Sequence, residues 1–144
     1  MSWIELNSVK DVEHLNDLFG CFHDSYLKEM CFSSGCYIDE DLSMHEYNNP
    51  IARFLFQRQW SNPSVIEIEF RDVLQINKKP AKENEFSDII CSHIYLEDGI
   101  FFWNSSDYEI HDDGKDDYTW ISAKKVCWRI SDELLGSMNI YMKE

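Results

Sequence analysis

Residues 65–76 alternate between apolar and polar side chains more regularly than any other stretch of the chain. One predicted face carries Ile66, Ile68, Phe70, Leu74 and Ile76, and the other carries Glu67, Glu69, Arg71 and Gln75. A period of two residues is typical of a strand with one buried face and one solvent-exposed face. Asp72 interrupts the apolar face, which predicts a bulge or a division into two shorter strands. The stretch therefore predicts an antiparallel sheet with one wet face.

A hairpin is predicted around Asp98-Gly99, which separates the apolar runs 89–96 and 100–103. This dipeptide suits the two positive φ values of a type I′ turn. A two-residue loop places Glu97 opposite Ile100. The resulting register pairs Tyr95 with Phe102 and Ile94 with Trp103.

Further strands are predicted at residues 26–32, 52–60, 118–121 and 126–130, with a break at 122–125. Phe54, Phe56 and Trp60 share one predicted face, and a turn is predicted at Ser61-Asn-Pro-Ser64. The polar stretches 39–49 and 104–117 are predicted loops.

One helix is predicted over residues 8–19, because Ser8 and Asp11 can form a capping box and Gly20 can end the helix. Its apolar face consists of Val12, Leu15, Leu18 and Phe19. A single helical turn is expected at 131–136. These patterns predict an α+β fold that is predominantly antiparallel β-sheet, curled or barrel-like, with one N-terminal helix, in a single domain spanning residues 1–144.

Composition narrows the class of protein. The chain has 144 residues and a formal net charge of −14, which disfavours binding to nucleic acid or to anionic membranes. No apolar run is long enough for a membrane span. Five cysteines without paired spacing indicate reduced thiols and a soluble, cytoplasmic protein, in which Cys31, Cys91 and Cys127 are expected to be small buried hydrophobes.

The sequence contains no strong catalytic motif. His23 and Asp24 are adjacent at the end of the predicted helix, but neighbours in an extended chain point to opposite faces. We therefore expect a structural junction, with His23 partly buried and Asp24 accepting backbone N–H groups. No complete metal-ligand set, cofactor motif or activated nucleophile is evident, so the prediction is a non-enzyme without cofactor. A small metal-binding hydrolase that uses His23 and Asp24 is the alternative.

Residues 97–117 hold eight acidic residues and one lysine, half of the total net charge. A fixed negative potential favours encounter with a basic partner, and aromatic residues ringed by charge are typical of interface hot spots. The candidate binding residues are Tyr108, Asp112, Asp113, Asp116, Asp117, Tyr118 and Trp120. The alternative is that the rings belong to the core and the acids only maintain solubility.

The segment Leu18-Phe-Gly followed by Phe22-His23-Asp24 resembles small bacterial proteins with an F-H-D motif near the N-terminus. Some of these families are predicted immunity proteins of polymorphic toxin systems. The resemblance covers residues 3–32 and, more loosely, 60–70; Cys21 and the acidic insert 107–117 depart from it. It implies a non-enzymatic protein that neutralises a toxin, and it assigns no binding residues.

Together these patterns predict a non-catalytic binding module for a basic protein, such as a nuclease-type toxin domain. Self-association into a homodimer is the other alternative, because five Trp, seven Tyr and nine Phe can exceed what one small core hides.

Overall fold

The computed structural model describes residues 2–46, 49–106, 117–136 and 139–141. Its elements in chain order are β1 (Ile4–Glu5), α1 (Val9–Leu18), a 3-10 turn (Gly20–Phe22), β2 (Ser25–Ser33), β3 (Tyr37–Ile38), β4 (Met44–His45), β5 (Ile51–Arg58), β6 (Val65–Asn77), β7 (Ile94–Glu97), β8 (Ile100–Asn104), β9 (Trp120–Ile130) and a second 3-10 turn (Asp132–Leu134). The pairs formed by these strands are antiparallel. This confirms the predicted fold class.

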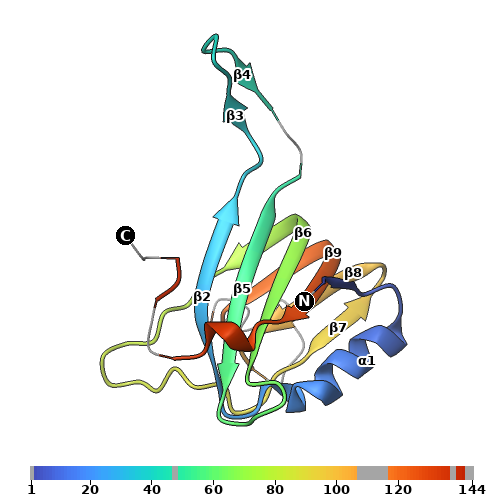
Figure 1. Cartoon of the computed structure of the whole chain (residues 1–144), viewed down its shortest axis with the longest axis vertical. Coiled ribbons are helices and arrows are strands. Elements are labelled where there is room, and N and C mark those ends of the chain that lie inside the picture. Colours follow the sequence, from blue (N-terminus) through green and yellow to red (C-terminus); the bar gives the residue numbers. More distant parts are fainter. Residues whose placement is uncertain (1, 47–48, 107–116, 137–138, 142–144) are drawn as a thin grey trace.

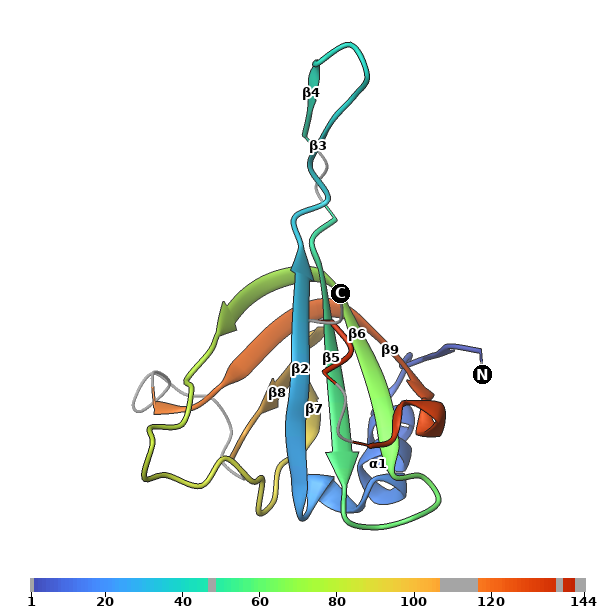
Figure 2. The ribbon, with the colours of Figure 1, turned by 60° about the vertical axis from the view of Figure 1, so that its left-hand side comes forward.

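The main sheet has the strand order β2-β5-β6-β9-β8-β7, and β1 adds to one end of β9. Figure 1 shows α1 at the opposite end of the sheet from the small β3–β4 hairpin. In Figure 2, β6 and β9 arch over the interior. In the described part of the chain β2 and β7 form the two edges. The sheet therefore curls without closing into a barrel.

Two local predictions are confirmed in detail. Helix α1 begins after Ser8, whose hydroxyl accepts from the backbone N–H of Asp11, and Gly20 follows its end with a φ of +58°. The β7–β8 hairpin turns at Asp98-Gly99 with φ values of +51° and +78°, and its register is the predicted one, Glu97 opposite Ile100. Both features follow from short-range rules, which is why the sequence alone was sufficient.

Strand β6 differs from its prediction on both faces. It is continuous, with a register shift between Val73 and Gln75, so the predicted bulge is confirmed. The shift brings Val73 and Ile76 against the core and leaves Leu74 half exposed, at 52%. The face predicted to be wet is buried at Glu67 and Glu69. The prediction is wrong at these two positions, because arginine side chains from β5, β6 and β9 pair with the glutamates, whereas Arg71 and Gln75 on the same face are exposed as predicted.

Several other strands and loops differ from their predicted boundaries. The predicted break at 122–125 is absent, because β9 pairs with β6 and β8 through this stretch. Strand β7 begins only at Ile94, and Ile89 forms an isolated bridge with Ser25. Trp60 lies beyond β5 and is 72% exposed, so it does not share the core face of Phe54 and Phe56. The predicted loop 39–49 contains β4.

The core is an aromatic cluster on the concave side of the sheet. Among the described residues, six of its large rings are fully buried: Phe19, Phe22, Phe54, Phe56, Phe70 and Trp103. Adjacent rings meet with centroids 4.9–6.2 Å apart, mostly edge to face. Phe19 and Leu15 bring α1 onto this cluster. The concave side is therefore filled by side chains from strands that are far apart in sequence.

The five cysteines are free thiols. Cys127 is buried as predicted, and burial raises its pKa to about 11. Cys31 is exposed, so its prediction as a buried hydrophobe was wrong. Among the described residues, no helix has the length and apolar character that crossing a membrane requires.

Candidate functional site

The Phe22-His23-Asp24 motif follows a turn with unusual backbone geometry. Gly20, Cys21 and Phe22 have consecutive positive φ values of +58°, +52° and +56°. Non-glycine residues rarely adopt this region, and they persist there only when surrounding contacts hold them. Here the ring of Phe22 is inserted among Phe19, Phe56 and Trp103. Phe22 is therefore the anchor that fixes the turn.

The two polar residues of the motif contact one another, contrary to the sequence prediction. Nε2 of His23 lies 3.2 Å from Oδ2 of Asp24, and Nδ1 of His23 lies 2.7 Å from the carbonyl oxygen of Ile90. Their side chains are 64% and 52% exposed, so the expected burial of His23 was also wrong. The reason is the φ of +53° at Asp24, which breaks the alternation of an extended chain. The His23–Asp24 pair therefore lies at the surface of the protein.

A cavity of about 370 Å³ lies beside this pair. It is lined by Asp17, Leu18, Gly20, His23, Asp24, Arg58, Gln59, Trp60 and Asn62. Arg58 lies over the ring of Phe19, 4.7 Å from its centroid, and its Nε donates to the carbonyl of Pro63 at 2.7 Å. Sequence reasoning missed Arg58, because nothing local connects it to the motif.

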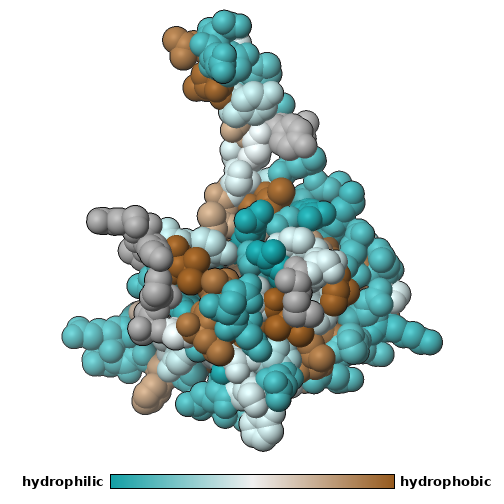
Figure 3. Space-filling view, in the orientation of Figure 1, coloured by the Kyte–Doolittle hydropathy of each residue, from teal (hydrophilic) through white to brown (hydrophobic). Residues whose placement is uncertain are grey.

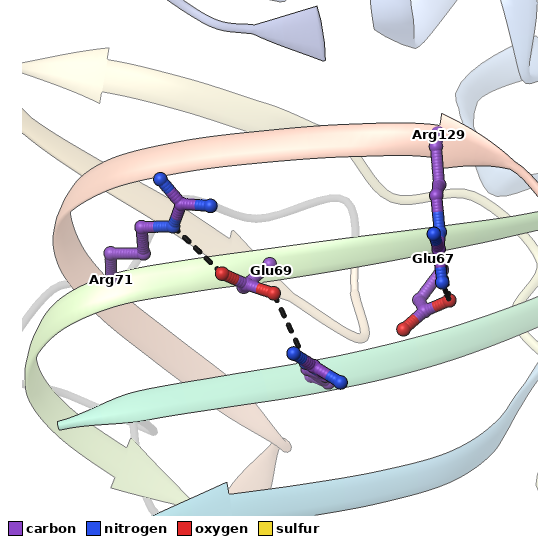
Figure 4. Close-up of polar contacts among 5 residues, drawn as sticks. Glu67, Glu69, Arg71 and Arg129 are labelled. Carbon is purple, nitrogen blue, oxygen red and sulfur yellow. Dashed lines mark hydrogen bonds and ion pairs between the residues drawn. The ribbon is translucent and has the colours of Figure 1, made fainter. Parts of the chain in front are cut away.

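A second set of charged residues lies on the convex face, where it has a structural role. Glu69 accepts from Arg53 at 3.0 Å and from Arg71 at 2.7 Å, and Glu67 accepts from Arg129 at 3.0 Å (Figure 4). The glutamate side chains are only 5% and 4% exposed. Each carboxylate is thus already ion-paired, as buried charges require.

Both ends of the chain cover this face. The ring of Trp3 lies 4.4 Å from the guanidinium of Arg129. The backbone N–H groups of Ile140 and Tyr141 donate to Glu29 on β2. Burial, with Glu67 nearby, raises the pKa of Tyr141 to about 12. The predicted wet face is therefore partly an interior layer.

The predicted acidic interface lies only partly in the described structure. Tyr108, Asp112, Asp113 and Asp116 fall outside the described residues. Asp117 is exposed and Tyr118 is half-buried. Trp120 is 4% exposed and pairs with Asn77 and Asn104. In this structure its ring packs inside the protein instead of facing a partner, which corresponds to the core alternative for this residue.

Residues 34–46, which we call the arm, form an acidic element that is exposed at most of its positions. It extends beyond β2 and β5, away from the rest of the molecule (Figures 1 and 2). It contains four acidic residues and no lysine or arginine. Four large apolar side chains on it are exposed: Tyr37 at 57%, Ile38 at 62%, Leu42 at 82% and Met44 at 78%. Figure 3 shows apolar atoms at its tip beside hydrophilic ones.

The arm is held by its own hydrogen bonds. Tyr37 pairs with His45, and their rings stack with centroids 4.6 Å apart. One carboxylate oxygen of Asp39 accepts from the backbone N–H groups of Asp41 and Ser43, and the other lies 2.6 Å from Nε2 of His45. The arm therefore presents its apolar residues from a defined hairpin. The sequence predicted only a solvated acidic loop here.

We expect the arm to lose its structure in acid. The hydrogen bond from His45, followed by that from Ser43, lowers the pKa of Asp39. Since the folded-state pKa is the lower one, the carboxylate stabilises the arm above the ordinary Asp pKa of about 3.9, and this is lost as pH falls through the lowered value. As the pH is lowered, the NMR chemical shifts of the Tyr37 ring protons should move to random-coil values. Asp39→Asn should show those values already at pH 7; native shifts in this variant would contradict the assigned role of Asp39.

Comparison with family models, curated proteins and solved structures found no match.

Proposed function

We propose that this protein is a non-catalytic binding module that engages a basic protein partner through the arm. The observation that carries this proposal is the exposure of Ile38, Leu42 and Met44 on an acidic hairpin that projects from the molecule. Contiguous apolar side chains that remain exposed in a folded protein are typical of interaction sites.

The composition of the arm supports the choice of partner. Its acidic residues Glu40, Asp41 and Glu46 are exposed, and Asp39 is half-buried. An acidic rim around an apolar centre attracts a cationic surface and accelerates encounter, while the apolar side chains slow dissociation. The pattern therefore fits a partner with a basic surface that surrounds an apolar pocket.

A nuclease-type toxin domain is the specific partner that we propose. Surfaces that bind nucleic acid are basic because they contact phosphates. An acidic arm is chemically suited to cover such a surface. The resemblance of the Phe22-His23-Asp24 segment to predicted immunity proteins supports the same partner, and the free thiols agree with neutralisation inside a reducing cytoplasm.

The alternative is a metal-binding hydrolase at His23 and Asp24, whose side chains are in contact beside the cavity. In the ranges that the structure describes, no three His, Cys, Asp or Glu side chains lie close enough together to hold a metal ion. Self-association through the exposed arm is an outcome that the following experiment distinguishes.

The test uses two arm variants against one identified partner. The partner is captured by chemical cross-linking in cells, identified by mass spectrometry, and measured with the purified chain by surface plasmon resonance at several salt concentrations. Leu42→Ser with Met44→Ser should raise the dissociation rate and increase Kd at least tenfold. Glu40→Lys with Asp41→Lys should slow association and weaken its salt dependence. Asp39 is left intact, so the hairpin should persist.

Two control variants locate the effect. Glu13→Lys with Glu133→Lys makes the same change in net charge at exposed positions elsewhere and should leave the association rate nearly unchanged. Asp112→Lys with Asp113→Lys and Asp116→Lys tests the other acidic segment. The proposal fails if no basic partner is captured, if both arm variants bind as the parent does, or if light scattering shows that the arm residues instead hold two copies of this chain together.

A further inference from the structure

Arg58 differs from the other three arginines in the contacts of its guanidinium group. The others bind buried glutamates, Arg53 and Arg71 at Glu69 and Arg129 at Glu67. In the part of the chain that the structure describes, no carboxylate forms an ion pair with Arg58. Among the described residues, the guanidinium group has one hydrogen-bond partner, the carbonyl oxygen of Pro63, to which Nε donates. Burial lowers the pKa of Arg58, while the charge of Asp132 opposes this shift.

The turn at Gly20–Phe22 leaves space for the guanidinium group of Arg58. A Cβ atom at Gly20 would lie 3.2 Å from Nη1 of Arg58, which is tighter than ordinary van der Waals contact. Gly20 also has the positive φ that favours glycine, at +58°. The ring of Phe19 also contacts this group, with its centroid 4.7 Å from the guanidinium carbon. The segment Phe19-Gly20 thus holds Arg58 at the wall of the cavity with its Nη groups unpaired among the described residues.

The charges that line the cavity restrict which anion it can take. A guanidinium group binds carboxylates and phosphates through its forked N–H groups. Asp17 and Asp24 line the same cavity, in a chain with a net charge of −14. Repulsion from these charges is larger for a phosphate that carries nearly two negative charges than for a carboxylate that carries one. The site therefore favours a monoanion.

Trp60 adds a preference for a flat group. It lines the cavity and its side chain is 72% exposed, so the indole is available to a ligand. Indole rings stack on other flat groups, and the stacking stabilises the contact beyond the area that it buries. A volume of about 370 Å³ lies within the range of small-ligand sites.

We propose that the cavity between the Gly20–Phe22 turn and Arg58 binds a small aromatic carboxylate. Arg58 binds the carboxylate through its Nη groups, Trp60 contacts the ring, and the His23–Asp24 pair borders the opening. This inference is independent of the arm. It gives the Phe22-His23-Asp24 motif a role in building a ligand site, since Phe22 anchors the turn beside which Arg58 lies.

Benzoate is the probe, and benzamide is the neutral molecule of the same shape. In assigned ¹⁵N–¹H spectra of the full chain, benzoate should shift the Gly20 amide and the Trp60 indole N–H signals saturably at millimolar concentration, and benzamide should not. The absence of saturable shifts, equal shifts with benzamide, or shifts confined to residues away from the cavity would each overturn the proposal. Tighter binding of inorganic phosphate at the same signals would overturn the choice of a carboxylate.

Variants test the assigned residues. Arg58→Gln should raise the Kd for benzoate at least tenfold, whereas Lys124→Gln, which removes the same charge from an exposed position on β9, should leave it unchanged. Because Arg58 also contacts Pro63 and Phe19, Trp60→Ala provides a variant at an exposed position that should keep the fold and weaken benzoate several-fold. Unchanged affinity in either cavity variant would contradict the assignment.

The carboxylate could belong to a free acid or to the end of a peptide chain. N-acetyl-glycyl-phenylalanine carries an aromatic ring and a carboxylate at the end of a peptide chain. Tighter binding of this peptide than of benzoate indicates a chain end, and tighter binding of benzoate indicates a free acid; both results support the site.

Discussion

Replacing Phe22 by alanine should lower the free energy of unfolding by about 3–5 kcal/mol, the range found for large-to-small changes in packed cores. The ring is fully buried, with its centroid 4.9 Å from that of Phe56 and 5.2 Å from that of Phe19. Its loss also removes the contact that holds Phe22 at a φ of +56°. Urea denaturation followed by intrinsic tryptophan fluorescence measures the change.

The matched control is Phe86→Ala. This ring is 93% exposed, so its removal should change the free energy of unfolding by no more than about 0.5 kcal/mol. A similar loss in both variants, or a loss below about 1 kcal/mol for Phe22→Ala, would show that the motif phenylalanine does not anchor the turn to the core.

The second large effect is expected at the convex face. Arg129→Ala should destabilise the protein by about 3 kcal/mol, because it leaves Glu67 buried without its ion-pair partner. Breaking a buried ion pair usually costs about 3–5 kcal/mol. We expect the lower end of this range, because the Arg129 side chain is itself 33% exposed whereas that of Glu67 is 4% exposed. The variant also loses the contact between Arg129 and Trp3. Urea denaturation again gives the free energy.

A pair of variants separates the ion pair from the loss of packing. Lys124→Ala removes a cation from an exposed position on the same strand and should be nearly neutral. Glu67→Leu with Arg129→Leu removes both charges and should recover most of the loss, because replacing a whole buried pair by apolar residues is often neutral. If the double variant is as unstable as Arg129→Ala, the unpaired carboxylate is not the cause.

The two proposals concern opposite ends of the β2–β5 hairpin. The arm follows Ser33 at the end of β2 and precedes Ile51 at the start of β5, whereas the cavity lies at Asp24, before β2, and Arg58, at the end of β5. Ser25 is paired with Arg58 in the register of these strands. Loss of partner binding in the arm variants and loss of benzoate binding in the cavity variants are therefore separable results.

The sequence by itself determined the features that depend on neighbouring residues. Helix α1 with its Ser8 cap and the turn at Asp98-Gly99 obey local preferences for hydrogen bonding and φ. The curled antiparallel sheet was also predictable in class, because alternation is a property of each strand separately. The candidate sites were harder to predict from the sequence. The Phe22-His23-Asp24 motif was recognised, but the cavity beside it was not.

Only the tertiary structure decided which polar residues are buried and which apolar ones are exposed. Glu67 is buried because β9 brings Arg129 beside it, and Arg58 lines a cavity because β5 ends against Phe19. The stretch 39–49 was predicted only as a polar loop, and the projection of the hairpin is what leaves Ile38, Leu42 and Met44 exposed together on the arm. Burial and ion pairing depend on contacts between strands that are distant in the chain, and the pattern within one strand carries no information about what covers its second face.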